Sequence, residues 1–345
     1  MRKFVFLLSV VLLGLLPTGV THAQDTGLAT LEHNGSISVF YGAKALAQAV
    51  DAAVDGDVVT LSAFMFNAVD ITKRISIYGA GAVTDSLGLR FPTVVNGDFK
   101  IEMAHNSNYS FIIEGIYFSN NTITIGDSLI NANFNKCRFY NLSIDGASTE
   151  LLFNSCRFIG DLKLGNQCDN IFVNNSVIRS LCGPTTNSVG LLVQNCVCLM
   201  DYTRFQKNIA NFRNTVLGKN STSDATLNRN AVTSYCVMCN DTDNEGGSAR
   251  YNSDGTNFNS VGPISNSELY GKSIYGLDFD NDMFILTDDA AAKYLGQDGT
   301  QVGIHGGSFP FSDVPQIPQI TKRDIAVKTS NDGKLDVDIK VEVQN

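Results

Sequence analysis

The sequence contains no tryptophan and only four histidines among its 345 residues. Sugar-binding sites often use an aromatic platform, so the absence of the largest aromatic side chain weakens the case for glycan binding, although 11 tyrosines remain to supply one. Beyond residue 23 the histidines are His33, His105 and His305, and none of them stands in a recognisable catalytic arrangement. His305 is expected to lie in a structural turn.

A surplus of basic residues is also lacking. The chain has 25 Lys and Arg against 34 Asp and Glu, which gives a net charge of −9. Two of the basic residues and none of the acidic ones lie in residues 1–23, so the remainder carries −11. An acidic protein repels phosphate backbones and anionic membrane surfaces. The composition therefore argues against a nucleic-acid partner, and against a strongly anionic substrate unless basic residues gather locally.

Long hydrophobic runs are missing as well. The apolar run at residues 4–16 is too short to span a bilayer, and no later segment is long and apolar enough to be a transmembrane helix. The run follows a basic start and precedes the small-residue sequence Thr21-His22-Ala23, a pattern typical of a secretory signal peptide. We therefore expect cleavage after residue 23 and a location that is secreted, extracellular or at the outer cell surface, with the periplasm also open.

What the sequence does contain is a repeat of about 20 residues between Ile112 and Cys239. It is visible in the similar runs FNKCRF at 134–139 and FNSCRF at 153–158. A fixed period of this length, with apolar and polar residues alternating inside each unit, is typical of a β-solenoid in which one unit forms one coil. Aligned on their central small residue, the units give Gly115, Cys137, Cys156, Ser176, Cys196, Thr215 and Cys236.

Four further columns of residues share this period. They predict three short strands per coil, and hence an all-β, right-handed parallel β-helix whose like residues stack at about 4.8 Å. Asparagine tolerates left-handed backbone, so two asparagine columns predict a ladder at a bend of the coil. The columns are Ile112, Phe134, Phe153, Val173, Val193, Phe212 and Thr233; Tyr117, Phe139, Phe158, Ile178, Cys198, Leu217 and Met238; Ile123, Leu142, Leu162, Leu181 and Tyr202; Ala132, Leu151, Ile171, Leu191 and Ala210; and, for asparagine, 135, 154 and 174 beside 175, 195 and 214.

Eight cysteines in an exported protein would ordinarily indicate disulfides. Here Cys137, Cys156 and Cys196 fall in the inward column of small residues, where cysteine serves as a small buried apolar side chain. We expect reduced core thiols, and leave open one or two disulfides between stacked coils. Cys236 and Cys239 have the spacing of a metal site, but Cys236 falls on the same column and no second pair follows, which argues against zinc.

The two ends of the chain differ from the repeat. Residues 43–53 have apolar residues at helical spacing and predict a helix that caps the solenoid, followed by an Asp-Gly-Asp turn at 55–57. The run DAAVDGDVVTLSAFMFNAVDITKRISIYGAG at 51–81 resembles the opening coil of pectate-lyase-like right-handed parallel β-helix proteins.

A capped helix is expected at 287–295, and the surrounding LTDDAAAKYLG and VGIHGGSFPF runs resemble the closing segment of secreted β-helix proteins from anaerobic gut-type bacteria, most of them uncharacterised. We expect a signal peptide at 1–23, a β-helix domain with its cap at 24–311, and a β-hairpin tail at 312–345.

An outward column beside the cysteines reads Ile116, Arg138, Arg157, Val177, Val197, Val216 and Val237. Lys136, Arg138 and Arg157 form a small basic spot, our candidate ligand-binding residues, which could hold a uronic-acid carboxylate; pairing with Glu114 or Glu150 is the structural alternative. Soluble proteins rarely leave an apolar stripe such as the four valines bare. We expect the hairpin tail or the polar loop at 240–262 to cover it, with a partner protein as the alternative.

Catalytic and metal-binding patterns are not apparent. β-Helix lyases resembling pectate lyase use an Arg or Lys base with Asp-bound calcium, and polygalacturonase-like hydrolases use clustered Asp residues with a Gly-His-Gly turn; neither pattern occurs here. Residues 241–246 resemble the start of a calcium loop, but Asn252 stands where the loop's last ligand, a Glu, is needed. Asp278, Asp280 and Asp282 alternate with apolar residues and predict a strand edge. No cofactor or metal is therefore expected, with calcium left open.

Three functions remain open at this point. The first is a non-catalytic secreted or cell-surface β-helix that binds or displays, with a polysaccharide or a surface protein as partner. The second is a polysaccharide lyase or glycoside hydrolase with a divergent site, and the third is a structural surface component. Because β-helices serve all three, the fold alone does not choose between them. We favour the first, and the sequence leaves the oligomeric state undetermined.

Overall fold

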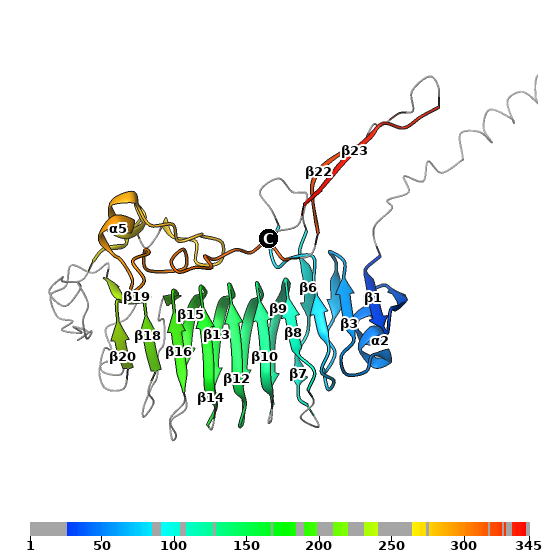
Figure 1. Cartoon of the computed structure of the whole chain (residues 1–345), viewed down its shortest axis with the longest axis horizontal. Helices are drawn as coiled ribbons and strands as arrows, with labels where there is room; N and C mark the ends of the chain where they lie inside the picture. The colour runs from blue at the N-terminus through cyan, green and yellow to red at the C-terminus, as the bar shows by residue number, and fades with distance from the viewer. Residues whose placement is uncertain are drawn as a thin grey trace, which may run out of the picture.

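The computed structural model describes residues 26–84, 91–103, 108–126, 129–166, 168–183, 190–198, 210–219, 231–240, 264–273, 276–316, 318–325, 328 and 333–342. The predicted signal peptide, the calcium-like loop at 241–246, His105 and Tyr202 lie outside these residues. The described chain is mostly β-strand and forms a parallel β-solenoid of about six turns, with about 20 residues in each turn (Figure 1).

Two long sheets form the walls of the solenoid, and each coil contributes a strand to both. Sheet A has 11 strands, of which the last nine run parallel to one another. In spatial order they are β2 (Ser36–Tyr41), β1 (Leu28–His33), β3 (Val58–Leu61), β5 (Ser76–Tyr78), β8 (Phe111–Glu114), β10 (Ile130–Asn135), β12 (Thr149–Asn154), β14 (Asp169–Asn174), β16 (Leu191–Gln194), β18 (Ala210–Arg213) and β20 (Ala231–Ser234).

Sheet B has 10 strands, all parallel to their neighbours. From β9 onward each follows a strand of sheet A after a short bend in the coil. From the C-terminal end the strands are β21 (Val237–Asn240), β19 (Val216–Lys219), β17 (Val197–Cys198), β15 (Val177–Cys182), β13 (Arg157–Leu164), β11 (Arg138–Ile144), β9 (Ile116–Ile125), β6 (Thr93–Asn96) and β4 (Met65–Asn67), with β7 (Phe99–Ile101) also paired to β9.

The register confirms the predicted columns except in the first unit. Phe134, Phe153, Val173, Val193 and Phe212 are consecutive partners in sheet A, and the columns through Leu142 and Leu151 also hold. Phe134, however, pairs with Ile113 rather than Ile112. Arg138 likewise pairs with Tyr117 rather than Ile116. Alignment on the small residue Gly115 was therefore wrong by one position, and Ile116 is the true counterpart of Cys137.

The error arose because Gly115 belongs to the bend and not to the core. At each bend one residue adopts positive φ, and the seven residues that do so are Gly115, Lys136, Ser155, Asn175, Asn195, Asn214 and Tyr235. Asparagine and glycine suit this conformation. The predicted ladder is confirmed beside it, since Asn154 Nδ2 donates to Asn135 Oδ1 at 3.2 Å and Asn174 Nδ2 to Asn154 Oδ1 at 3.3 Å.

The solenoid interior is filled by stacked apolar side chains. Phe134 and Phe153 stack with ring centroids 4.8 Å apart, which matches the spacing of adjacent strands. Cys137, Cys156 and Cys196 are fully buried and not disulfide-bonded, as predicted. Each thiol donates to a main-chain carbonyl two residues earlier, and Ser176 and Thr215 make the same bond from the same column. The column therefore requires a small hydrogen-bond donor, and sulfur is one way to supply it.

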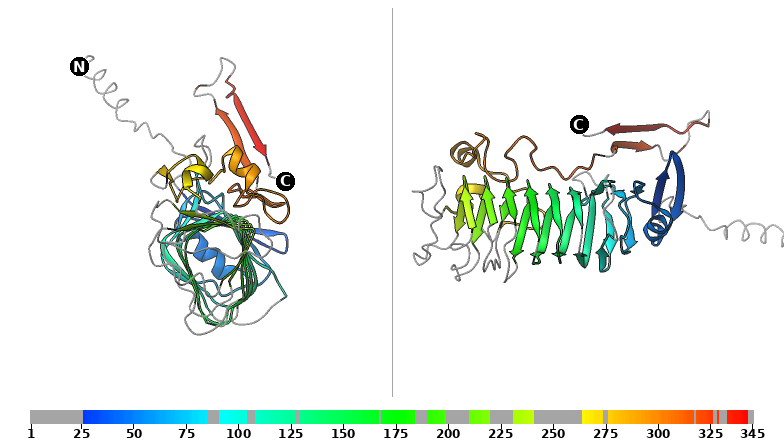
Figure 2. Two further views of the ribbon diagram at one scale, coloured as in Figure 1. Left: turned by 90° about the vertical axis from the view of Figure 1, so that its left-hand side faces the viewer. Right: turned by 60° about the horizontal axis from the view of Figure 1, so that its bottom comes forward.

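The predicted cap helix closes the N-terminal end of the core. It is α2 (Ala45–Ala52), and it buries Ala45, Leu46, Ala49 and Val50. The antiparallel pair β1 and β2 packs beside it and ends sheet A. In a view along the solenoid axis, α2 lies across the ring of strands (Figure 2).

A second apolar core lies outside sheet B. The stripe formed by Val177, Val197, Val216 and Val237 is at most 1 % exposed. It is covered by residues 264–302, here called the cover, which contain α4 (Asn266–Tyr270) and α5 (Asp288–Lys293). We predicted that the chain itself would cover this stripe, and it does. The covering segment was predicted wrongly, because it is neither the hairpin tail nor, in the described residues, the polar loop.

From the cover the chain returns along the bend of the solenoid as a strap, residues 303–316 (Figure 1). Gly303 N donates to Asn214 O at 2.8 Å, Asn175 Nδ2 to Gly306 O at 2.8 Å, and Gln316 N to Glu114 Oε1 at 2.6 Å. A Cβ added to Gly115 would lie 3.1 Å from Pro315, so the strap passes close to the backbone there. Through these bonds the strap contacts three coils whose residues lie about 90 to 200 positions earlier in the chain.

The tail beyond the strap forms β22 (Gln319–Ile325) and β23 (Val337–Glu342), an antiparallel pair. These two strands form a sheet of their own. The hairpin stands away from the solenoid in both views (Figures 1 and 2).

Candidate functional site

The three predicted ligand-binding residues lie close together where sheet B begins. Arg138 and Arg157 are register partners on β11 and β13, and Lys136 occupies the bend immediately before β11. The cover and the strap pass over the same place, so the structure puts the predicted basic spot under another part of the chain.

Arg157 is the most deeply buried of the three. It is 5 % exposed, and its guanidinium donates to Phe279 O at 3.2 Å and to Asp282 O at 2.9 Å. Its Cζ also lies 5.6 Å from the ring centroid of Phe311. Burial, aided by the neighbouring Arg138 charge, lowers the pKa of Arg157 to about 10. These contacts make Arg157 an attachment point for the cover.

Arg138 and Lys136 are held less tightly. Arg138 lies 4.8 Å from the ring centroid of Tyr117, its register partner, and donates to Asn281 Oδ1 at 3.3 Å. Its Nε is buried and makes no hydrogen bond to a described residue. Burial lowers the pKa of Lys136, and this effect is opposed by the carboxylates of Glu114 and Asp313. Glu114 was one of the acidic partners named as the structural alternative.

The predicted strand edge at Asp278, Asp280 and Asp282 is instead a turn of the cover that faces these arginines. Asp278 Oδ1 accepts from the backbone N–H of Asp280 at 3.1 Å, which fixes the turn. Asp280 lies 3.9 Å from Arg179, and Asp282 pairs with Lys272 at 2.8 Å. The turn therefore supplies two carbonyls to Arg157 and an amide oxygen to Arg138, while its carboxylates pair with neighbouring basic residues. An external anion would have to displace this turn, and ligand binding by Lys136, Arg138 and Arg157 stays a prediction.

Replacing Arg157 with alanine tests this structural role. Loss of the side chain leaves two partly buried carbonyls without this donor, so we expect Arg157→Ala to lower the free energy of unfolding by about 2–4 kcal/mol. Arg138→Ala removes a single, longer bond and serves as the matched control, with an expected loss of about 1 kcal/mol or less. Urea unfolding of both variants measures the difference. Equal losses would contradict the assignment of Arg157 as the attachment point.

The outer face of sheet A carries a different candidate site. Leu152, Phe172 and Leu192 are consecutive register partners whose side chains are half-buried or, for Phe172, 37 % exposed. They form an apolar line that runs along the solenoid axis. Beside it runs the amide ladder, which continues from Asn174 through Gln194 to Arg213. An apolar strip edged by hydrogen-bonding groups is typical of small-molecule and sugar sites.

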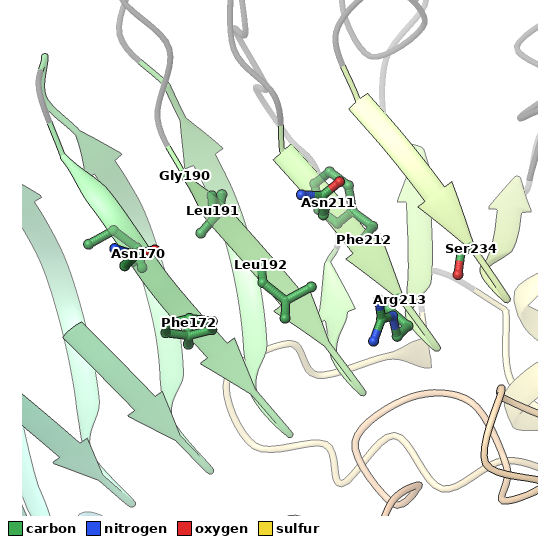
Figure 3. A pocket seen from close by; sticks show the side chains of 10 residues that line it. Asn170, Phe172, Gly190, Leu191, Leu192, Asn211, Phe212, Arg213 and Ser234 are labelled. Atoms are coloured by element: carbon green, nitrogen blue, oxygen red, sulfur yellow. The ribbon is translucent and has the colours of Figure 1, made fainter. Parts of the chain in front are cut away.

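The line ends in a shallow open depression of about 380 Å³. Figure 3 shows Asn170, Phe172, Leu192 and Arg213 around it, on neighbouring strands of sheet A. Gly190 also lines it, and a Cβ there would lie only 2.1 Å from Asp169 Oδ1, so the backbone of β14 and the chain before β16 are in close contact at this point. Arg213 is exposed and supplies the only charged side chain of the lining. An aromatic ring, amides and one guanidinium thus face the same hollow.

Reasoning from the sequence missed this site. Phe172 and Leu192 stand at positions that the alternation assigns to solvent, and this was the available signal, because it marks apolar residues on an outward column. The same signal led to the valine stripe on sheet B. Attention to the basic residues drew the prediction to sheet B instead of sheet A.

Within the described residues there is no group of three or more His, Cys, Asp or Glu side chains able to hold a metal ion. The calcium-like loop at 241–246 is outside that range, so calcium binding there is untested. None of the described helices is long and apolar enough to cross a membrane. His305 lies in a turn as predicted, and its Nε2 donates to Met283 O at 2.8 Å.

Comparisons with known proteins found no matching family model, no similar curated protein and no similar solved structure.

Proposed function

We propose that the chain is a non-catalytic protein that acts outside the cell, secreted or held at the outer surface, and that it binds a polysaccharide through the outer face of sheet A. The observation that carries this proposal is the depression around Phe172, with its apolar line and its edge of amides. A pyranose ring presents an apolar C–H face and a rim of hydroxyl groups, so it needs both a flat apolar surface and hydrogen-bond partners.

The geometry of a repeating ligand suits this surface. Successive coils place equivalent side chains about 4.8 Å apart, comparable with the length of one sugar residue in an extended chain. Each ladder amide has two N–H donors and an acceptor oxygen, and the ladder bonds use only part of this capacity. The remaining donors and acceptors are available to hydroxyl groups along the axis.

We also propose that the solenoid is a right-handed β-helix of the pectate-lyase-like kind, with a third strand in each coil. The resemblance of residues 51–81 supports this, as do the register shifts inside β11 and β13, which divide each of these strands into two parts. The predicted signal sequence at 1–23 supports export.

Glycan binding by the mature chain tests the proposal. We expect retention of at least one polysaccharide on a glycan array, and a rise of about tenfold or more in its dissociation constant for Phe172→Ala. Tyr140→Ala is the matched control, because Tyr140 is an aromatic residue of similar exposure, 43 %, on sheet B. It should change the affinity by less than about twofold.

Two results would contradict the proposal. One is equal loss of affinity in both variants, which would place the site elsewhere. The other is release of unsaturated or reducing sugar ends from a bound polysaccharide, which would favour the lyase or hydrolase alternative. The assay should be run with and without calcium, so that the untested loop at 241–246 is included.

A further inference from the structure

The hairpin carries an apolar face that no described segment covers. Alternation along β23 puts its apolar side chains on one face, and the backbone register sets Ile320 and Ile325 of β22 opposite Val341 and Val337. The valine stripe on sheet B, which we expected the hairpin or the polar loop at 240–262 to cover, is occupied by the cover. The exposed fractions are 48 % for Leu335, 49 % for Val337, 48 % for Ile339 and 54 % for Val341.

The charges of the hairpin are balanced within the hairpin itself. Lys322 forms an ion pair with Asp338 across the two strands, and Lys340 forms one with Glu342 along β23. Residues 318–342 contain five basic and five acidic residues, so the hairpin is neutral although the whole chain carries −9. Two copies of an acidic protein repel each other over most of their surface. At the hairpin this repulsion is locally absent.

A hairpin of two strands is marginally stable in water on its own and gains stability when its apolar face is buried. From these observations we propose that the apolar faces of two hairpins, one from each of two copies of this chain, pack together as a small four-stranded sandwich about 10 Å thick. A two-fold contact of this kind needs a surface that complements itself. A neutral apolar face meets that requirement, and an acidic or basic partner would gain no charge attraction from it.

Sedimentation of the mature chain, residues 24–345, tests the pairing. Over about 1 µM to about 1 mM, we expect a monomer–dimer equilibrium without larger species, because a two-fold contact closes on itself. Ile339→Lys puts a charge at the centre of the apolar face and should raise the dissociation constant by about tenfold or more. Lys340→Gln, on the opposite face of the same strand, is the matched control and should leave the equilibrium unchanged.

A chain that ends at Gln316 provides the second variant, because Ile339→Lys also alters the hairpin itself. It keeps the solenoid, the cover and the strap, and we expect a folded monomer with an unchanged circular dichroism minimum. A wild-type chain that remains monomeric throughout the series would overturn the proposal, as would a dimer that persists in the truncated chain. Glycan binding through sheet A does not depend on either outcome.

Discussion

Raising the pH to about 10–11 is expected to unfold the protein, with a loss of stability much steeper than surface groups produce. The cause is the column of buried thiols. Burial raises the pKa of Cys137, Cys196 and Cys236 to about 12, and that of Cys168 to about 11. Burial also raises the pKa of Cys156 well above its ordinary value. In the unfolded chain the same thiols ionise near pH 8.5.

The direction in which stability changes with pH follows from proton binding. Between the unfolded and the folded pKa the native state keeps protons that the unfolded state releases, so stability is complete below about pH 8.5 and is lost as the pH rises toward 12. Each such thiol contributes a slope of about 1.4 kcal/mol per pH unit, and four of them about 5 kcal/mol per pH unit. Since domains are commonly stable by about 5–15 kcal/mol, unfolding is expected near pH 10–11.

The control for this experiment is present in the chain itself. Ser176 occupies the same column and donates to the same kind of carbonyl at 2.6 Å, so Cys→Ser at positions 137, 156, 196 and 236 replaces titrating donors with non-titrating ones. The quadruple variant should lose less stability per pH unit between pH 9 and 11 in urea unfolding, whatever its stability at pH 7. Tyrosine and lysine titrate alike in both proteins. Equal slopes would mean that the thiols are not buried in solution.

Introducing a charge into the second apolar core, between sheet B and the cover, is expected to have the second largest effect on stability. Val197 is 1 % exposed and lies between sheet B and the cover, so Val197→Asp buries a carboxylate with no basic partner. We expect a loss of about 3–5 kcal/mol, because the charge must be dehydrated or the cover must separate from the sheet. Limited proteolysis distinguishes the two, since separation of the cover makes residues 264–316 the first segment to be cut.

Asn133→Asp is the matched control for this substitution. Asn133 stands on an outward column of sheet A, away from the valine stripe of sheet B on which the cover packs, and its side chain is half-buried. The same new charge should change the stability there by less than about 1 kcal/mol. If both variants lost stability equally, the cover would not be packed on the valine stripe in solution.

The repeat allowed most of the solenoid to be predicted from the sequence, because stacked coils place like residues in contact and the column shows which ones. The alignment of the first unit on Gly115 failed for a local reason. A small residue suits both the core column and the left-handed bend, and the sequence does not show which of the two positions it occupies. The valine stripe predicted that something covers sheet B. It could not predict which segment covers the sheet, because apolar burial is not directional and the sequence of the cover contains no repeat.

For the candidate sites too, the sequence predicted which residues stack within the solenoid but not which segments pack against them. The repeat correctly placed Arg138 beside Arg157, yet their hydrogen-bond acceptors come from residues 279–282, more than 120 positions later along the chain. Only the folded chain shows that these arginines are attached to a turn. The depression on sheet A is open because no described residue covers it, and the sequence does not show which segment will lie over which sheet.

The strap also determines how the molecule responds to a pulling force. It attaches the hairpin to the solenoid at Glu114, near the middle of the chain's long axis and not at its C-terminal end. Tension applied through the hairpin is therefore borne first by the bond from Gln316 to Glu114, then by the contact of Ser312 with Ser155, and then by the bonds of Asn175. These contacts break one after another, while the backbone hydrogen bonds between the strands of the two sheets carry none of the force. The strap would yield before any coil unwinds, so the sheets keep their shape under load.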